Sequence, residues 1–350
     1  MSFSKDLIQW YFINKRDLPW RNTENPYFIW LSEIMLQQTR VAQGTPYYLS
    51  FTENYPTVFD LANASEQDVL KLWQGLGYYS RARNLHKTAQ QVAYEFNGIF
   101  PGNYEALLNL KGVGEYTAAA IASFAFNETV AVVDGNVFRV LSRYFDVDLD
   151  ISIHSTKKEF QKLAFSLLPK GKAADFNQAI MEFGALQCVP KSPNCGICVL
   201  NDSCLALQKK KVNLLPVKTK KVKVTNRFFN YLIFEDSQLK ILVNQRTDKG
   251  IWHNLYEFPL LETEKLEDFD CISQKIITDF NYDTIVTSIS ELNPIVQIHK
   301  LTHQHLHIKF WRVRVNGNLK SGIAINTLKN YPFPIVLFNF IENALIVDFD

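Results

Sequence analysis

The sequence predicts a multidomain chain in which an all-α part, residues 1–208, precedes an α+β part, residues 227–350. Three observations predict this organisation. The 350 residues are enough to form two domains with separate cores. Apolar residues recur with helical spacing through the first two hundred positions. After about residue 226, β-branched and aromatic segments separated by turn residues replace that spacing.

The helical part contains several helix-start signals. Asn25 precedes Pro26 at the head of NPYFIWLSEIMLQQTRVAQGTPYYLSF, so we expect an N-cap followed by proline at the first helical position. Ser65 is the expected N-cap of ASEQDVLKLWQGLG, which ends on a glycine-rich turn. Four further stretches continue the helical spacing: NYEALLNL, EYTAAAIASFAF, GNVFRVLSRYF and STKKEFQKLAFSLLP.

A run of lysines marks the boundary between the two parts, which we place at residues 209–226. Seven lysines and no acidic residue lie between Lys209 and Lys223. Such a run is typical of a solvated linker, and a basic linker could also follow a phosphate backbone. The segments after it are typical of strands, namely RFFNYLIFED, QLKILVNQR, IVTSISEL and HLHIKFWRVRV.

The bulk composition excludes few classes of function. A net charge of +2 neither requires nor rules out a nucleic-acid partner. No run approaches eighteen uninterrupted apolar residues, and charges interrupt the N-terminal residues, so we expect neither a membrane span nor a signal peptide. The expected location is therefore the cytoplasm. No feature indicates oligomerisation, and we expect a monomer.

Four of the five cysteines form a cluster with the pattern C-x6-C-x2-C-x5-C. They are Cys188, Cys195, Cys198 and Cys204. Disulfides are rare in the cytoplasm, so the pattern predicts a metal or cluster site. Four thiolates suit either tetrahedral zinc or an iron–sulfur cluster, and the spacing alone does not decide between them. Cys271 is remote in the sequence and is expected to be a packed thiol.

A glycine turn, Gly112-Val113-Gly114, joins two of the expected helices. It exposes backbone N–H groups at the start of a helix, which is a favourable place for an anion such as a DNA phosphate. Without other evidence the turn would be interpreted as a simple interhelix connection.

Two carboxylates stand in positions that suit catalysis. Asp134 precedes the helix GNVFRVLSRYF and is the expected N-cap, and N–H groups that hold a carboxylate also keep it ionised. Glu33 lies within a largely apolar helix. A lone glutamate is usually at the surface, but apolar neighbours would raise the pKa of Glu33 and let it act as an acid. An acid and an anion in separate roles are what glycoside hydrolysis uses.

The glycine turn, Asp134 and the cysteine loop together resemble the endonuclease III superfamily of DNA glycosylases. The resemblance narrows to the MutY-type adenine DNA glycosylases. It is carried by LPWR (18–21), SEIMLQQTRV (32–41), GLGYYSRARNLH (75–86), GVGEYTAAAIASF (112–124), VVDGNVFRVLSR (132–143) and the cysteine loop. It implies a catalytic domain at 1–208 with a six-helix barrel and helix–hairpin–helix at about 20–130. An iron–sulfur module at 1–19 and 131–208 would hold one structural [4Fe–4S] cluster on the four cysteines.

The resemblance also implies roles for individual residues. Glu33 would protonate N7 of adenine, and Asp134 would stabilise the sugar cation or bond to it transiently. Tyr116 and Asn136 would position these groups. Tyr116 stands where lyase relatives have lysine, which implies removal of the base without strong strand cleavage. Further implied contacts are Arg21, Glu182 and Trp20 at the adenine pocket, Gln38 and Tyr78 as an intercalating wedge with Leu36 and Thr39 nearby, and Gly112, Val113 and Gly114 at a DNA phosphate.

In this family the C-terminal part is a MutT-like (Nudix-fold) domain that recognises 8-oxoguanine, and GIWHNLYEFPLLE (250–262) resembles one of its loops. The pyrophosphatase motif REUxEExGU is absent from the sequence, so we expect binding only. The family's Phe-Ser-His loop corresponds here to Leu301, Thr302 and His303. A zinc site on the alternating His303, His305 and His307 is the alternative interpretation of this stretch.

We therefore expect an enzyme that flips adenine out of double-stranded DNA and removes it from A:8-oxoguanine and A:G pairs on the chromosome. One alternative is a pyrimidine-lesion glycosylase/lyase of the endonuclease III type, which would require lysine where Tyr116 stands. The other is a non-catalytic mismatch-binding protein, which would need neither Glu33 nor Asp134.

Overall fold

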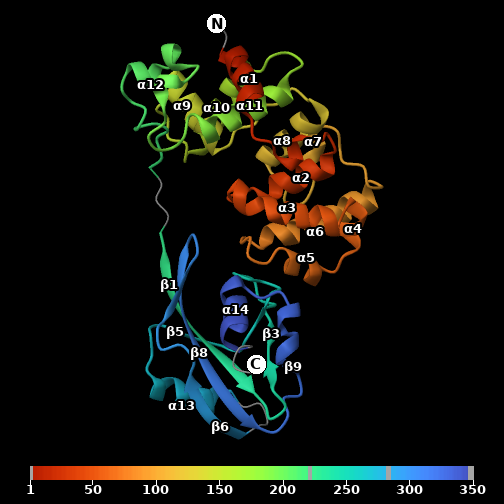
Figure 1. Cartoon of the computed structure of the whole chain (residues 1–350), viewed down its shortest axis with the longest axis vertical. Coiled ribbons are helices and arrows are strands. Elements are labelled where there is room, and N and C mark those ends of the chain that lie inside the picture. Colours follow the sequence, from red (N-terminus) through yellow and green to blue (C-terminus); the bar gives the residue numbers. More distant parts are fainter. Residues whose placement is uncertain (1–2, 220–222, 281–284, 346–350) are drawn as a thin grey trace. The chain divides into compact units, whose positions relative to one another are not determined.

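The computed structural model describes residues 3–219, 223–280 and 285–345. Its contacts divide the chain into two compact units (Figure 1). The first unit contains Met1–Asn63 and Asn84–Lys220, and the second contains Ala64–Arg83 and Lys221–Asp350. The expected fold class, a helical part followed by an α+β part, is confirmed. Among the described residues, no helix combines the length and apolarity needed to cross a membrane.

The first unit is built from α-helices and short 3₁₀ turns. Its elements are α1 (Phe3–Asn14), η1 (Pro19–Arg21), α2 (Pro26–Met35), α3 (Val41–Asn54), α4 (Val58–Asn63), most of α6 (Ser80–Glu95), α7 (Tyr104–Leu107), α8 (Glu115–Phe126), α9 (Gly135–Phe145), α10 (His154–Ser166), α11 (Ala173–Leu186), η2 (Cys195–Ile197), η3 (Asn201–Ser203) and α12 (Leu205–Gln208). The predicted cap is present, because the Asn25 side chain accepts the Tyr27 N–H at 3.0 Å and Pro26 opens α2.

The long stretch that begins at Asn25 is two helices rather than one. Helix α2 ends at Met35 and α3 begins at Val41. Between them Gln38 has φ 56°, a left-handed conformation that interrupts helical hydrogen bonding. The interruption leaves Gln38 exposed in a turn instead of on a helix face.

Packing in the first unit brings distant segments together. Helix α11 packs against α1, α8 and α9, and α2 packs against α8. One core lies around α1, α9, α10 and α11, with Leu7, Leu141, Phe160 and Phe176 fully buried. These helix pairs place side chains of α2, α8, α9 and α11 around one interior space.

The first part of the lysine run contacts the first unit, although its side chains stay partly exposed. Lys209 and Lys211 both form ion pairs with Asp146, at 2.8 and 3.1 Å. Further along, the carbonyl of Val217 accepts the Ile151 N–H at 3.0 Å. Residues 209–219 thus contact the first unit at these points, and Asp146 at the end of α9 supplies the opposite charge, while the side chains of Lys209 and Lys211 remain 55% and 37% exposed. Residues 220–222 lie outside the described part of the chain.

The second unit is organised around a sheet. It also contains helix α5 (Glu66–Leu72), and the predicted N-cap of this helix is present, because the Ser65 hydroxyl accepts the Asp68 N–H at 3.1 Å. Within the described residues the sheet has seven strands, in the order β6-β8-β1-β2-β9, with β5 paired to β1 and β7 to β8. The strands are β1 (Thr225–Glu235), β2 (Lys240–Leu242), β5 (Leu260–Thr263), β6 (Ile285–Glu291), β7 (Gln297–Lys300), β8 (Gln304–Asn316) and β9 (Gly322–Ala324); β3 (Asn244–Gln245) and β4 (Tyr256–Glu257) form a separate pair.

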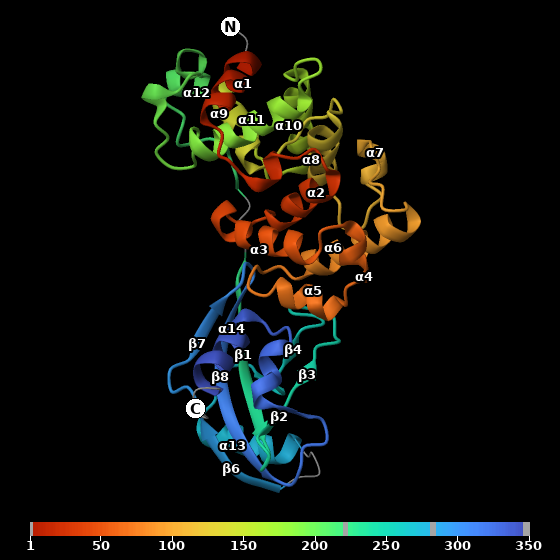
Figure 2. The same cartoon turned by 45° about the vertical axis from the view of Figure 1, so that its right-hand side comes forward.

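The two long strands β1 and β8 run parallel and side by side at the centre of this sheet (Figure 2). The helices of the unit include α13 (Phe269–Asp279) and α14 (Ile335–Phe340), with η4 (Ile325–Asn330) and a terminal π turn, Ile341–Leu345. Trp311 of β8 is completely buried between α13 and the sheet. The predicted strand segments RFFNYLIFED and HLHIKFWRVRV thus correspond to β1 and β8, the central strands of the unit.

Candidate active site

The glycine turn precedes α8. Gly112 has φ 73°, and a Cβ there would lie 2.7 Å from Asn84 Cβ, so both conformation and space require glycine. Gly114 is the N-cap residue of α8 and supplies no side-chain cap. An added Cβ at Gly114 would meet nothing within 4 Å. The N-terminus of α8 is therefore open, as the predicted phosphate contact requires, and that contact stays a prediction.

Glu33 is buried rather than at the surface, with 6% of its area exposed. It lies on α2 among apolar neighbours, and the Tyr116 hydroxyl of α8 donates to its Oε2 at 2.7 Å. Burial raises the pKa of Glu33 from 4.5 to about 7, and the nearby charge of Asp134 adds to the increase. The Tyr116 hydrogen bond and Arg21 act in the opposite direction. Glu33 can therefore hold a transferable proton near neutral pH.

Asp134 is the N-cap of α9, as predicted. Its Oδ1 accepts the N–H groups of Asn136 and Val137, both at 2.8 Å, and its Oδ2 accepts the Asn136 side-chain amide at 2.7 Å. Capping alone would lower the pKa of Asp134. Burial is the larger influence and raises it, while the hydrogen bonds from Val137 and Asn136 partly offset the increase. The carboxylate is thus held in place by donors on two sides.

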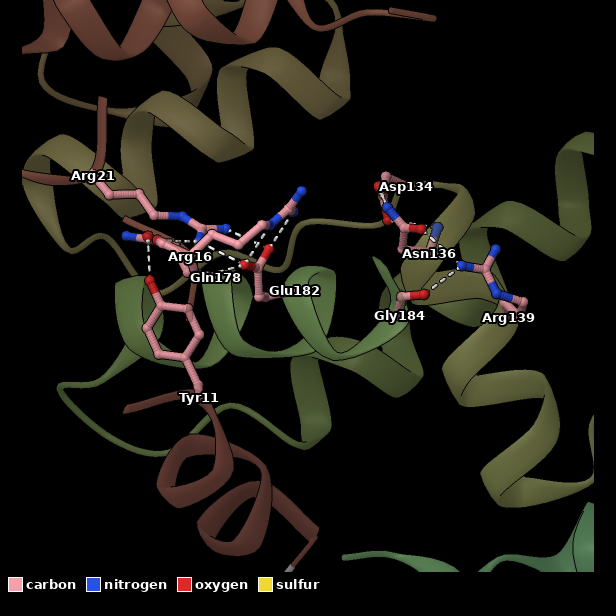
Figure 3. A network of polar contacts seen from close by, with 9 residues as sticks. All are labelled: Tyr11, Arg16, Arg21, Asp134, Asn136, Arg139, Gln178, Glu182 and Gly184. Carbon is pink, nitrogen blue, oxygen red and sulfur yellow. Dashed lines mark hydrogen bonds and ion pairs between the residues drawn. The ribbon is translucent and has the colours of Figure 1, made fainter. Parts of the chain in front are cut away.

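Arg139, which we did not select from the sequence, fixes the amide of Asn136 (Figure 3). Its Nη2 donates to Asn136 Oδ1 at 2.8 Å and to the Gly184 carbonyl at 2.7 Å. Because arginine can only donate, the Asn136 oxygen must face Arg139 and its NH₂ must face Asp134. A Cβ on Gly184 would lie 2.6 Å from Asn136 Cβ, so this glycine lets α11 approach α9. The one local signal for Arg139 is its position one helical turn after Asn136.

Glu182 of α11 is held by two arginines (Figure 3). Arg16 donates to both carboxylate oxygens, from Nε at 2.8 Å and Nη2 at 2.6 Å, and Arg21 also donates to both, from Nη1 at 2.9 Å and Nη2 at 2.7 Å. Burial alone would raise the pKa of Glu182, but the hydrogen bonds from Arg16 and Arg21 outweigh it and lower the pKa to about 2. Only 1% of Glu182 is exposed. Arg16 was missed in the sequence because nothing local links it to Glu182.

These groups line one cavity of about 570 Å³ in the first unit. That size lies within the roughly 300–1,000 Å³ of small-molecule sites. It brings together all seven residues predicted for catalysis and the adenine pocket, namely Trp20, Arg21, Glu33, Tyr116, Asp134, Asn136 and Glu182. Leu36 and Thr39, predicted near the wedge, also line it. It adds residues that we did not predict: Arg16, Ser32, Arg139, Gln178 and Met181 among them. Gln178 is fixed by the Tyr11 hydroxyl, which donates to its Oε1 at 2.8 Å (Figure 3).

The cavity contains two glutamates with opposite properties. Glu33 has a pKa of about 7 and its nearest hydrogen-bond donor is a neutral phenol, whereas Glu182 has a pKa of about 2 and binds two cations. Environments that separate the pKa values of two acids in this way assign them different tasks. Glu33 is equipped to give a proton, and Glu182 is equipped to hold Arg16 and Arg21 rigidly.

Other predicted residues lie elsewhere. Tyr78, Thr302 and His303 belong to the second unit. Tyr78 is 47% exposed and has φ 50°, and its hydroxyl lies 2.5 Å from the Thr302 hydroxyl. Gln38 also has positive φ, so both residues expected to form the wedge adopt a left-handed conformation. This is uncommon for residues other than glycine, although eight other such residues occur in the described chain, Asn127 and Asp146 at helix ends among them.

The four clustered cysteines line a second, largely apolar cavity of the first unit. Arg143 Nη1 donates to Cys188 Sγ at 3.4 Å and to the Val189 carbonyl at 2.8 Å, which ties α9 to the cysteine loop. Burial raises the pKa of the Cys198 thiol to about 11, so a bound cation is needed to keep it a thiolate. The thiol donor set and the adjacent guanidinium fit an iron–sulfur cluster, in which the thiolates bind different iron atoms.

Nowhere in residues 3–219, 223–280 and 285–345 do three His, Cys, Asp or Glu side chains converge as a single metal ion requires. His303, His305 and His307 thus do not converge on one point in the described part of the chain. His307 is instead stacked on Phe228, with ring centroids 4.8 Å apart, and its Nε2 lies 3.1 Å from Asn226 Oδ1.

Comparison with known families agrees with this architecture. Residues 31–166 match the HhH-GPD superfamily of base-excision DNA repair proteins, and residues 188–204 match the iron–sulfur binding domain of endonuclease III. Residues 230–343 match the NUDIX domain. The predicted fold of both parts and the iron–sulfur site are thereby confirmed.

The sequence is also similar to curated proteins named adenine DNA glycosylase. The one from Buchnera aphidicola subsp. Schizaphis graminum is 36% identical, over 87% of this chain and 86% of its own length. The human one is 44% identical, over 59% of this chain and 40% of its own length. Among solved structures, a thermostable thymine-DNA glycosylase is 32% identical with a TM-score of 0.55, over 59% of this chain and 95% of its own. An endonuclease III–DNA complex, 24% identical with a TM-score of 0.52 over 59% of this chain and 94% of its own, shares the fold.

Proposed function

This chain belongs to the adenine DNA glycosylase family, and from that premise we propose that it removes adenine paired with 8-oxoguanine or guanine in double-stranded DNA. As a member of the family it is a DNA N-glycosylase of base-excision repair. The observation that carries the proposal is the pairing of Glu33 and Asp134 in one cavity. Glu33 is an acid with a pKa of about 7, and Asp134 is a carboxylate held by hydrogen-bond donors of Asn136. Glycosidic bond cleavage requires both.

The reaction needs the adenine outside the base stack, because the glycosidic bond cannot be reached within a duplex. With the base in the cavity, Glu33 gives its proton to N7 and the C1′–N9 bond breaks, with its electron pair leaving on adenine. Asp134 stabilises the positive sugar or bonds to C1′ until water attacks. Arg16 and Arg21, oriented by Glu182, and the wall formed by Trp20 hold the base during these steps.

Tyr116 favours removal of the base without a lyase step. Its hydroxyl is bound to Glu33, and burial raises its pKa well above the ordinary value of 10.0. A neutral buried phenol offers no amine that could attack the sugar. This supports the adenine-specific reaction over a pyrimidine-lesion lyase, and the retention of both carboxylates disfavours a protein that only binds mismatches.

The base opposite the adenine is proposed to contact the second unit. Tyr78 and Thr302, whose hydroxyls lie 2.5 Å apart, and the exposed His303 offer a stacking ring and hydrogen-bonding groups within a short distance. Because this unit lacks the pyrophosphatase motif, its role is binding. The protein is proposed to act on the chromosome as a monomer.

One assay tests the reaction. Purified protein is incubated with duplexes containing A:8-oxoguanine, A:G, A:T or thymine glycol, and alkali then cleaves any abasic site. We expect cleavage at the adenine of the first two duplexes and none at A:T or thymine glycol. Product only from thymine glycol would favour the lyase alternative, and no product from any duplex would favour a binding protein.

We propose that the iron–sulfur cluster is of the [4Fe–4S] type. Cys188, Cys195, Cys198 and Cys204 would hold it, and it would fix the loop that Arg143 ties to α9, without taking part in bond cleavage. The purified protein is expected to be brown, to absorb near roughly 400 nm and to contain about four iron atoms per chain. Cys198→Ser is expected to lose iron and absorbance, whereas the control Cys271→Ser retains both. Zinc in place of iron would contradict the proposal.

A further inference from the structure

Residues 64–83 precede most of α6 in the sequence, yet they form a compact unit with residues 221–350. Polar contacts hold this segment along its length. Arg83 Nη1 donates to the His253 carbonyl at 2.8 Å, and Gln74 Nε2 donates to the Phe333 carbonyl at 2.7 Å. Other contacts join Glu66 to Asn254, Gln67 to Tyr256 at 3.3 Å, and the Lys71 ammonium to the Phe338 ring at 4.2 Å.

The segment carries Tyr78 in an unusual conformation. A glycine-rich turn leads into it, with φ 97° at Gly75 and 79° at Gly77, and Tyr78 itself has φ 50°. Arg81 supports the turn, because its guanidinium donates to the Gly77 carbonyl at 3.1 Å and lies 5.5 Å from the centre of the Tyr78 ring. An aromatic residue keeps a left-handed conformation only where its surroundings impose it.

The loop that holds the end of this segment has similar backbone geometry. Trp252 has φ 61° and Asn254 has φ 65°, and His253 between them presents its carbonyl to Arg83. Two segments with left-handed residues other than glycine thus meet at a charge-assisted hydrogen bond, which is stronger than a neutral one, and Glu66 adds a second contact to the same loop through Asn254. Loss of the Arg83 bond would remove the contact nearest to Tyr78 and leave the loop held to this segment through Glu66 and Asn254.

We propose that Arg83 is a positioning residue for Tyr78. By holding the His253 carbonyl, Arg83 fixes loop 250–255 against residues 75–83 and so keeps the Tyr78 hydroxyl beside Thr302, where the base opposite the adenine is recognised. This rests on the proposed function. It has a direct consequence: Arg83 controls the preference for 8-oxoguanine over guanine and leaves the chemistry at Glu33 and Asp134 unchanged.

Binding is measured first, so that the result does not depend on catalysis. The full-length protein is titrated with duplexes carrying 8-oxoguanine or guanine opposite a tetrahydrofuran abasic analogue. Arg83→Gln is expected to reduce the affinity ratio by about tenfold, the effect of losing one charge-assisted hydrogen bond. Arg83→Lys, which still has a donor, is expected to recover part of it. The matched control is Lys87→Gln, which removes an exposed charge one turn further along α6 and should leave the ratio unchanged.

Single-turnover excision from A:8-oxoguanine and A:G duplexes separates this role from a general loss of structure. Arg83→Gln should slow only the 8-oxoguanine reaction. In a Tyr78→Phe background, which lacks the hydroxyl, Arg83→Gln should cause no further loss, since coupled residues are not additive. Equal losses on both duplexes, or additive losses, would overturn the inference. The two proposals can fail separately. If the protein excises no adenine but its binding preference for 8-oxoguanine still depends on Arg83, the proposed function is overturned and this inference stands.

Discussion

Replacing Glu33 with glutamine is expected to slow adenine excision severely and at the same time to stabilise the folded protein. Glutamine preserves the shape of the side chain and can still accept the Tyr116 hydroxyl, which donates at 2.7 Å in the wild type. It cannot give a proton to the leaving base. Loss of a positioned general acid is expected to slow excision by about 10²- to 10⁴-fold.

The gain in stability follows from the pKa of Glu33. Burial raises it from 4.5 to about 7, so the folded protein binds this proton more tightly than the unfolded chain. Stability is therefore lost as the pH rises from 4.5 to about 7, and above pH 7 the buried charge costs about 3 kcal/mol. Glu33→Gln has no such charge. Its free energy of unfolding should exceed that of the wild type by about this amount at pH 8 and by nothing at pH 4.

Three measurements check this result. Single-turnover excision gives the rate, urea unfolding at pH 4 and pH 8 gives stability, and the wild-type rate is followed across pH. The wild-type rate should fall as the pH rises through about 7, because the protonated form of Glu33 is then lost. The matched control is Glu24→Gln, an exposed carboxylate just before α2 that should change neither quantity. An active Glu33→Gln protein would show that another group protonates adenine.

Local features of the site could be predicted from the sequence because their causes are local. A cap needs only a short polar residue before a helix, so Asn25, Ser65 and Asp134 were identified correctly as N-caps. Glu33 stands among apolar residues of its own helix, and burial follows from that pattern. Gly112 is a similar case, because a positive φ in a tight turn selects glycine.

Features that depend on packing between distant segments had no such signal. Arg16 and Glu182 are 166 positions apart, and their pairing arises only when α11 packs beside the N-terminal residues. The ion pairs of Lys209 and Lys211 with Asp146 had no signal either, because Asp146 lies more than sixty residues earlier. The association of residues 64–83 with the C-terminal unit also had no signal, because the helices on both sides of this segment in the sequence belong largely to the other unit.

Replacing Asp134 is expected to separate its two functions, capping α9 and facing the reacting sugar. Asparagine and serine are N-caps of about the same quality as aspartate, so Asp134→Asn and Asp134→Ser should both retain the hydrogen bonds from the Asn136 and Val137 N–H groups. Neither carries the negative charge. We expect excision to fall by at least about 10²- to 10³-fold in both, the effect of removing one preorganised electrostatic group.

The two variants should differ in stability. In Asp134→Asn a new NH₂ group can occupy the place of Oδ2, 2.7 Å from the Asn136 amide nitrogen, so two donors would face each other. Asn136 cannot turn its oxygen toward position 134, because Arg139 already donates to that oxygen. Asp134→Asn should therefore lose about 1–3 kcal/mol of stability relative to Asp134→Ser, which places no donor there.

Excision rates and urea unfolding of both variants decide between the two functions. If Asp134 acts only as a cap, Asp134→Ser must remain active, since serine supplies the same hydrogen bonds to the start of α9. If its charge is required, both variants lose excision although their helices stay capped. Burial raises the pKa of Asp134, which means that the buried charge is unfavourable in the folded protein. If position 134 were needed only to cap α9, a protein with serine there would cap the helix without this cost. Inactive but folded Asp134→Ser would show that the charge is retained for the reaction.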